Sequence, residues 1–323
     1  MTSLIPYTKP YQTASELCEK LIEQSLVIKN KKNAERVLER CSYYRFKAYL
    51  YPFLDQNKKF NGLTTFDDLD SLYKFDEELR LLVFRKIQHI EIGVRSLFDQ
   101  HMTVQTDNKF WYLSSIYFAS ASNNHVRTIS KVRDMFVNSK EDFALHFSKK
   151  YYNEHCPFYR DLPPGWVAIE LMSFGNISNL LKGLHSNYHV ELNVDRFVQK
   201  RFHVKNYQIF SNWISVIHDV RNLCGHHSRL FNRNLKAPTS IKKILNKDIV
   251  LVKTKPVENR REEDQLNRIY TALAAMQKIL TGLGYDKFGN ELMTLFDKYP
   301  ISKKFHPAMG FPVNWENEKL FFT

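Results

Sequence analysis

The feature that most constrains the fold is a long segment, Phe66 to His101, in which apolar residues recur at intervals of three and four. This spacing places them along one side of an α-helix, whereas a strand would need alternation. The recurring positions are Leu69, Leu72, Tyr73, Leu79, Leu82, Val83, Ile87, Ile90, Val94 and Leu97. Thr65 followed by Asp68 is typical of a helix start. We therefore predict one long amphipathic helix in a helical protein.

Helical spacing recurs along most of the remaining chain, and the residues that favour tight turns are scarce, with 10 Gly and 11 Pro among 323 residues. The further predicted helices are Ser15–Glu23, one capped by Asn33, one from Trp166 through Leu180, Gln208–His226 and Asp264–Leu283. Residues 55–62 and 237–255 are predicted to be irregular. We predict an all-α protein in which residues 1–62 form an N-terminal helical extension packed on one helical domain, residues 63–323.

Charge and cysteine usage narrow the class of protein. Lys and Arg total 47 against 34 Asp and Glu, a net charge of +13, which suits a polyanion such as nucleic acid or simply describes a basic protein. The cysteines, Cys18, Cys41, Cys156 and Cys224, are far apart, which favours reduced thiols. We find neither a signal-like N-terminus nor an apolar run long enough for a bilayer. We therefore expect a soluble, cytoplasmic protein with no membrane contact.

Residues 221–233 hold the most specific chemistry, with three arginines, two adjacent histidines and two asparagines. On a helix, His227 falls in an apolar stripe and is expected to be structural, whereas His226 lies on the polar face beside Asn222. Arg221 and His226 project about 140° apart. Either a kink at Gly225 or a symmetric dimer would bring an arginine and a histidine to one phosphate.

The string Arg-Asn-x3-His-His-x-Arg-Leu-aromatic-Asn-Arg resembles the signature of the abortive-infection family of bacterial phage-defence proteins (the AbiD and AbiF group). This family belongs to the HEPN superfamily, whose members share an Arg-(polar)-x3-to-5-His nuclease motif. Other blocks similar to the family's occur in order, namely Ser42-Tyr43-Tyr44-Arg45-Phe46, Ile90-Glu91-Ile92-Gly93-Val94-Arg95, Trp166 to Ser173-Phe174-Gly175, and Met309-Gly310-Phe311-Pro312 with Trp315. The resemblance therefore covers most of the chain.

The resemblance implies an all-α HEPN-like helical bundle, a homodimer, and metal-independent RNA cleavage in antiviral defence. It also implies a small noncoding RNA that restrains the protein as an antitoxin would. RNA suits these residues because its 2′-hydroxyl is an internal nucleophile. We assign proton transfer to His226, phosphate stabilisation to Arg221 and orientation to Asn222, with a 2′,3′-cyclic phosphate and a 5′-hydroxyl as products.

Other residues are assigned supporting roles. The RNA-binding candidates are Arg229, Arg233, Asn232 and His218. Arg229 and Arg233 could equally be surface cations at a helix end. Glu91 and Arg95, four residues apart, are expected to form a structural or secondary ion pair, and His227 is placed with them.

Three alternatives remain open. The Arg and His cluster could hold a cognate noncoding RNA without cutting it, or it could be a structural network in a dimer. Tyr43 and Tyr44 could stack on bases or lie in the core. No cofactor is expected, because His146, His155 and Cys156 lack the spacing and carboxylate partners of a metal site and no glycine-rich phosphate loop is present.

Overall fold

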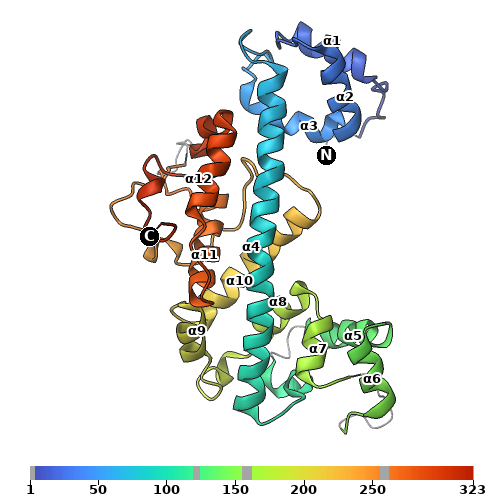
Figure 1. Cartoon of the computed structure of the whole chain (residues 1–323), viewed down its shortest axis with the longest axis vertical. Coiled ribbons are helices and arrows are strands. Elements are labelled where there is room, and N and C mark those ends of the chain that lie inside the picture. The colour runs from blue at the N-terminus through green and yellow to red at the C-terminus, as the bar shows by residue number, and fades with distance from the viewer. Residues whose placement is uncertain (1–3, 119–123, 155–161, 255–261, 323) are drawn as a thin grey trace. The chain divides into compact units, whose positions relative to one another are not determined.

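The computed structural model describes residues 4–118, 124–154, 162–254 and 262–322 (Figure 1). Over these ranges the chain forms twelve α-helices and short 3-10 turns, with no β-strand. The all-α prediction is therefore confirmed. Within the same ranges, no helix has both the length and the apolar character needed to cross a bilayer.

Contacts between residues divide the chain into two compact units. Unit 1 comprises Met1–Glu78 with Leu295–Lys304, and unit 2 comprises Leu79–Thr294 with Phe305–Thr323. The predicted N-terminal extension, residues 1–62, falls inside unit 1. That unit also includes the first turns of the long helix predicted from the apolar spacing.

Unit 1 is built on α1 (Ala14–Glu23), α2 (Lys31–Cys41), α3 (Tyr43–Leu50) and the start of α4 (Phe66–Thr106). Asn30 caps α2, because its side-chain oxygen accepts a hydrogen bond from the Asn33 backbone N–H at 3.0 Å. The prediction that Asn33 is the cap is wrong. The preceding asparagine occupies the capping position, and the helix begins before residue 33.

The start of α4 follows the predicted pattern. The Asp68 backbone N–H donates to the Thr65 hydroxyl at 3.1 Å, and the Thr65 N–H donates to the Asp68 carboxylate at 2.9 Å. These reciprocal bonds satisfy backbone donors that a helix start would otherwise leave unpaired.

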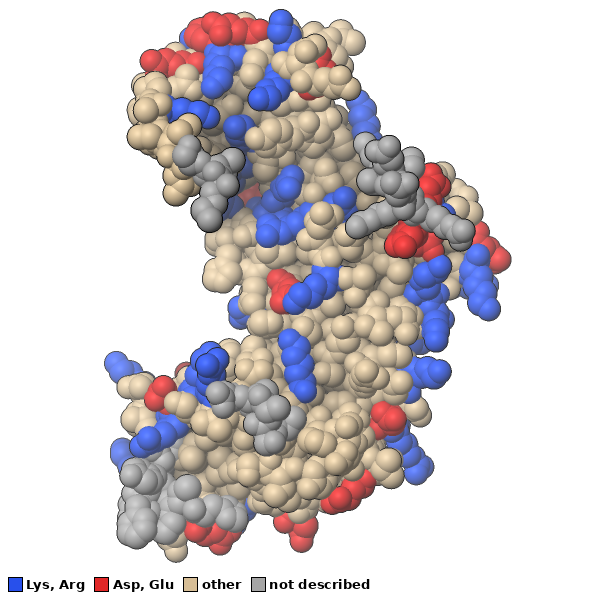
Figure 2. All heavy atoms as spheres, turned by 180° about the vertical axis from the view of Figure 1, so that it is seen from behind, with Lys and Arg blue, Asp and Glu red and all other residues tan. Residues whose placement is uncertain are grey.

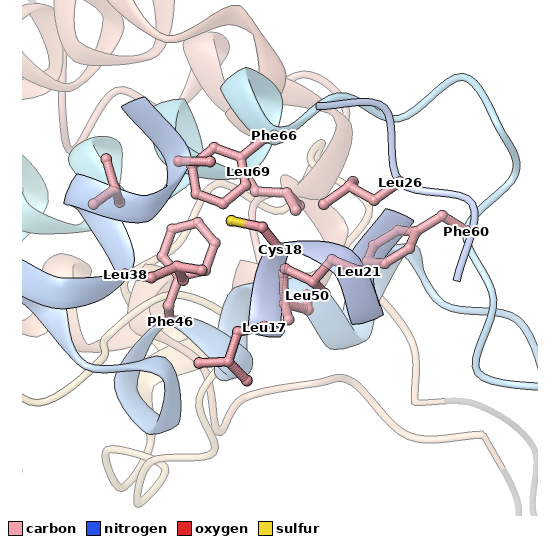
Figure 3. Packing of buried hydrophobic residues seen from close by; sticks show 12 residues of the cluster. Leu17, Cys18, Leu21, Leu26, Leu38, Phe46, Leu50, Phe60, Phe66 and Leu69 are labelled. Carbon is pink, nitrogen blue, oxygen red and sulfur yellow. The ribbon is translucent and has the colours of Figure 1, made fainter. Parts of the chain in front are cut away.

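The core of unit 1 joins α1, α2 and α3 to the first turns of α4 (Figure 3). The rings of Phe46 and Phe66 stack there with centroids 5.1 Å apart. Cys18 lies fully buried at the centre, and burial, followed by the charge of Glu35, raises the pKa of its thiol to about 11. The thiol therefore acts as a small apolar packing group.

Unit 2 contains the rest of α4 and the helices that follow it. These are α5 (Asn124–Val137), α6 (Asp142–Lys150), α7 (Gly165–Leu171), α8 (Phe174–Gly183), α9 (Val194–Phe202), α10 (Tyr207–Gly225), α11 (Ile269–Gly282) and the first part of α12 (Gly289–Lys298). Helix α10 packs against α8, α9 and α11. It buries most of its length, and the polar side chains of its last turns, such as Arg221 and Asn222, are half-buried.

Two predicted helices differ in the structure. The helix predicted from Trp166 through Leu180 is divided, since α7 ends at Leu171 and the Ser173 side chain caps α8 by accepting from the Asn176 N–H at 3.2 Å. Helix α11 begins at Ile269 rather than at residue 264, because residues 264–267 bond to other loops. The Gln265 N–H, for example, donates to the Val252 carbonyl at 2.7 Å.

Candidate functional site

The motif-bearing helix α10 ends at Gly225, within one residue of the prediction. The Ser228 N–H donates to the Leu223 carbonyl at 2.8 Å, and the His227 N–H donates to the Cys224 carbonyl at 3.0 Å. His227 adopts a left-handed backbone conformation with φ of 53°. This pair of bonds around a left-handed residue is the Schellman helix end.

The placement of His227 on an apolar helical stripe is therefore wrong. Projection at a helical angle does not apply after Gly225, and the His227 side chain is exposed. Leu230 and Phe231 are the fully buried residues of this stretch, and the Phe231 ring packs edge-on against Phe305 at 5.2 Å. Burial of these two side chains turns the chain away from the helix axis.

His226 lies at the end of α10 as its C-cap residue, with its side chain exposed. Its backbone N–H donates to the Asn222 carbonyl at 2.9 Å. The kink considered at Gly225 does not occur, because the helix stops there. The imidazole is thus placed at an accessible helix terminus, one turn beyond Asn222.

Arg221 belongs to an ion cluster that joins α10 to α4. The Arg95 Nη2 atom donates to Glu91 Oε1 at 2.8 Å, as predicted from their spacing. The other carboxylate oxygen, Glu91 Oε2, lies 3.7 Å from Arg221 Nε. Arg95 also donates from Nη1 to the carbonyl of Glu170 in α7 at 3.3 Å. One carboxylate therefore positions two arginines, and the cluster keeps a net positive charge.

A pocket of about 240 Å³ opens beside this cluster. Its lining residues are Phe84, Ile87, Gln88, Glu91, Ile92, Arg95 and Arg221. The Arg221 guanidinium lies over the Phe84 ring, 5.6 Å from its centroid, and the Arg221 side chain keeps 37% of its surface exposed. In the described ranges, the buried Nε atoms of Arg95 and Arg221 have no hydrogen-bond partner. An anion in the pocket would meet the exposed part of the Arg221 guanidinium, whose positive charge Glu91 shares with Arg95 and so neutralises only in part.

His218 and Asn222 form a second polar pair one turn apart on α10. The Asn222 amide nitrogen lies 3.1 Å from His218 Nε2, and because that nitrogen only donates, Nε2 accepts. Burial lowers the pKa of His218, Asp219 opposes this effect, and Lys182 and other nearby cations add to it. His218 is therefore a neutral acceptor near pH 7, and Asn222 is oriented by it.

The remaining RNA-binding candidates lie beyond the helix end. Asn232 accepts a hydrogen bond from Arg268 Nη1 at 3.3 Å, and Arg233 is exposed. Burial, with the charge of Arg229 adding to it, lowers the pKa of Arg268. Arg229 and Arg268 are therefore near enough for their charges to interact.

Sequence reasoning missed three residues of this site. Arg268 carries no local signal, since it precedes α11 far along the chain. Phe84 and Gln88 share the α4 face of Glu91 and Arg95, at spacings of three, four and seven residues that a helical projection would have revealed.

Of the possible metal ligands named from the sequence, the structure describes one. His146 lies in α6, whereas His155 and Cys156 fall outside the described residues. Among the described residues, no three His, Cys, Asp or Glu side chains are grouped closely enough to hold an ion.

The candidate site lies within the part of the chain that matches a known protein family. The sequence profile of the Abi-like protein family matches residues 36–232, more than half of the chain, and so includes both the Glu91 cluster and the end of α10. No protein of curated function and no solved structure matches significantly. The chain therefore belongs to the Abi-like protein family, an abortive-infection family.

Proposed function

We propose that this protein is a HEPN-type, metal-independent endoribonuclease that acts in abortive infection. The observation that carries the proposal is the position of Arg221. Glu91 holds it at a pocket on one side of α10, while His226 stands exposed at the end of the same helix. A fixed cation and an accessible imidazole are the two groups that cleavage by a 2′-hydroxyl needs.

In the proposed reaction, His226 takes the proton from the ribose 2′-hydroxyl. The 2′-oxygen attacks phosphorus, and Arg221 stabilises the added negative charge of the phosphorane. The bond to the 5′-oxygen breaks, and that oxygen takes up a proton from solvent. The products are a 2′,3′-cyclic phosphate and a 5′-hydroxyl. Asn222, oriented by His218, positions the phosphate beside Arg221.

The proposed active unit is a homodimer, because each chain holds one copy of the motif. Arg221 and His226 lie five residues apart around the end of a helix, so Arg221 of one subunit and His226 of the other would complete one centre. Exposed apolar side chains on α4 beside the pocket, Leu81 at 66% and Ile92 at 55%, would be covered in such a dimer. A small noncoding RNA is proposed to restrain the enzyme by occupying its basic surface.

The test is RNA cleavage by purified full-length protein in EDTA, after removal of any RNA that copurifies. His226→Ala should abolish cleavage and retain RNA binding, because the imidazole acts on the proton and not on affinity. His227→Ala is the matched control, since it removes the adjacent exposed imidazole, and it should keep cleaving. The 3′ ends of the products should be cyclic phosphates, which resist alkaline phosphatase and become open to ligation only after treatment with polynucleotide kinase.

The alternative is a protein that binds a cognate noncoding RNA without cutting it. RNA binding by wild-type protein with no cleavage of any substrate would contradict the proposed enzyme and favour this reading. Equal loss of cleavage in His226→Ala and His227→Ala would contradict the assignment of His226.

A further inference from the structure

Helix α3 of unit 1 carries an exposed aromatic face that the core does not use. Tyr44, Lys47 and Tyr51 are three and four residues apart, so they lie on one side of the helix and its continuation. Tyr44 is 76% exposed and Tyr51 is 59% exposed. Of the two roles left open for these tyrosines, Tyr44 does not lie in the core, whereas Tyr43 is half-buried.

The opposite side of α3 shows why these rings are left out. Phe46 and Leu50 are 0% and 2% exposed and fill the unit 1 core (Figure 3). Tyr49 is also buried, and its hydroxyl donates to Asp76 at 2.6 Å. A single helix cannot turn both faces inward. Phe46 and Leu50 on one side of α3 fill the core, so the rings of Tyr44 and Tyr51 on the other side stay exposed and can contact a ligand.

The exposed face extends into the N-terminal segment. Tyr7, a residue with 74% of its surface exposed, lies close enough to Tyr44 that the Tyr44 hydroxyl raises the pKa of Tyr7. Lys47 Nζ lies 5.7 Å from the centroid of the Tyr51 ring. Three aromatic side chains and an ammonium group therefore form one continuous surface, which we call the tyrosine face (Tyr7, Tyr44, Lys47 and Tyr51).

The charged residues next to the tyrosine face in the sequence are all cations. Residues 4–15 and 40–54 contain no Asp or Glu, and their charged residues are Lys9, Arg40, Arg45 and Lys47. An aromatic surface with cations in its own chain segments suits a ligand that combines planar rings with negative charge. Single-stranded nucleic acid has this combination, because its bases are free to stack and its phosphates follow alongside.

We propose that the tyrosine face binds single-stranded RNA, with bases stacked on Tyr44 and Tyr51 and a phosphate held by Lys47. Seven helical residues separate the two rings by about 10 Å along the axis, so they receive different bases of one strand. The proposal rests on the proposed function in one respect, that RNA is the ligand of this protein. It adds a second contact region, in a unit that lacks the Arg221 and His226 pair.

The experiment measures binding of a fluorescein-labelled, unstructured oligouridine to full-length protein by anisotropy. All variants are made in a His226→Ala background, so that the RNA stays intact. Tyr44→Ala with Tyr51→Ala should weaken binding about 30-fold or more, from the contribution of each stacked base. Tyr44→Phe with Tyr51→Phe should bind like the parent, since phenylalanine keeps the stacking ring.

Two further measurements separate stacking from other effects. Tyr152→Ala, which removes a tyrosine that is 61% exposed in unit 2, is the matched control and should leave affinity unchanged. Crosslinking with 4-thiouridine RNA should place the modified peptides at Tyr44 or Tyr51. Unchanged affinity in the double alanine variant, with its thermal transition intact, would overturn the proposal, as would an equal loss in the double phenylalanine variant.

The proposed nuclease activity and the proposed RNA binding by the tyrosine face can be contradicted independently of each other. If wild-type protein cuts RNA but the alanine variants bind normally, the tyrosine face is wrong and the nuclease stands. If no RNA is cut but binding depends on these rings, the nuclease is wrong and the tyrosine face stands.

Discussion

Glu91 is the residue on which the geometry of the candidate site depends. Its two carboxylate oxygens face Arg95 at 2.8 Å and Arg221 at 3.7 Å, and its side chain is only 17% exposed. Without this carboxylate, two guanidinium groups on neighbouring helices would repel each other with little water to screen them.

Glu91→Gln should therefore slow RNA cleavage without weakening RNA binding. The amide keeps an acceptor for Arg95 but loses the charge that positions Arg221, so we expect single-turnover cleavage to slow about tenfold. RNA affinity should hold or rise, because the protein gains one positive charge. Glu191→Gln makes the same change of charge at an exposed position. Weaker binding with an unchanged rate would contradict a positioning role for Glu91.

Asp99 in α4 is a buried carboxylate whose ionisation opposes folding. It is 3% exposed, its Oδ1 accepts a hydrogen bond from Trp111 Nε1 at 2.8 Å, and burial raises its pKa to about 6 from 3.8. The folded state thus holds this proton more tightly than the unfolded state. The resulting contribution to the free energy of unfolding is complete below about pH 4 and is lost as pH rises through about 6.

Asp99→Asn should remove this pH dependence. The amide oxygen can still accept from Trp111, and no charge is buried, so we expect the variant to be more stable than the parent at pH 7 by up to about 3 kcal/mol. Urea unfolding at several pH values between 4 and 7 measures the difference. A constant gap between variant and parent across this range would show that the pKa of Asp99 is not raised.

At the scale of elements, the place where α10 ends determines the positions of the His226 and His227 side chains. The helix closes through the left-handed His227, and a side chain with a β-carbon is strained in that conformation. The predicted apolar role of His227 failed because periodicity describes a helix only up to its end. The end itself depends on where Leu230 and Phe231 are buried.

Comparing His227→Gly with His227→Ala isolates this backbone effect. Both variants lose the imidazole and whatever it contacts, so their difference reports the conformation at residue 227 alone. Glycine should be the more stable by about 1 kcal/mol in thermal or urea unfolding. Both should retain cleavage. Equal stability would argue against the left-handed helix end.

Long helices with regular apolar spacing were predicted well. Helix ends that depend on contacts with other parts of the chain were not. The prediction for 66–101 became α4, which runs on to Thr106, and α10 was placed within a residue. The division between α7 and α8 was missed, because apolar spacing continues through it while Ser173 interrupts the backbone bonds. Local spacing reports which face is buried and does not register such a break.

At the scale of the molecule, the chain is strongly basic. On the face shown in Figure 2, Lys and Arg side chains lie in several separate groups with other residues between them. With a net charge of +13, we expect RNA to be held by several weak phosphate contacts. For about four or five contacts, the logarithm of the association constant should fall against that of salt with a slope of about −3. A flat response would contradict binding along the phosphate backbone.

The proposed dimer is tested by mixing inactive subunits. If Arg221 and His226 of different chains form one centre, a mixed dimer of Arg221→Ala and His226→Ala has one intact site. With random pairing, about a quarter of the wild-type activity should return. Each variant mixed with itself is the control. No recovery, with subunit exchange verified by differently tagged chains, would contradict a shared centre.

The sequence by itself determined the helical class, the family and the residue types of the site, because helical periodicity and motif strings are local properties of a chain. It also placed Arg221 and His226 near the end of α10. Only the tertiary structure decided that Glu91 of α4 holds Arg221, that α10 stops at Gly225, and that Tyr44 is exposed. These outcomes depend on which distant elements pack together, and periodicity identifies a buried face without identifying what covers it.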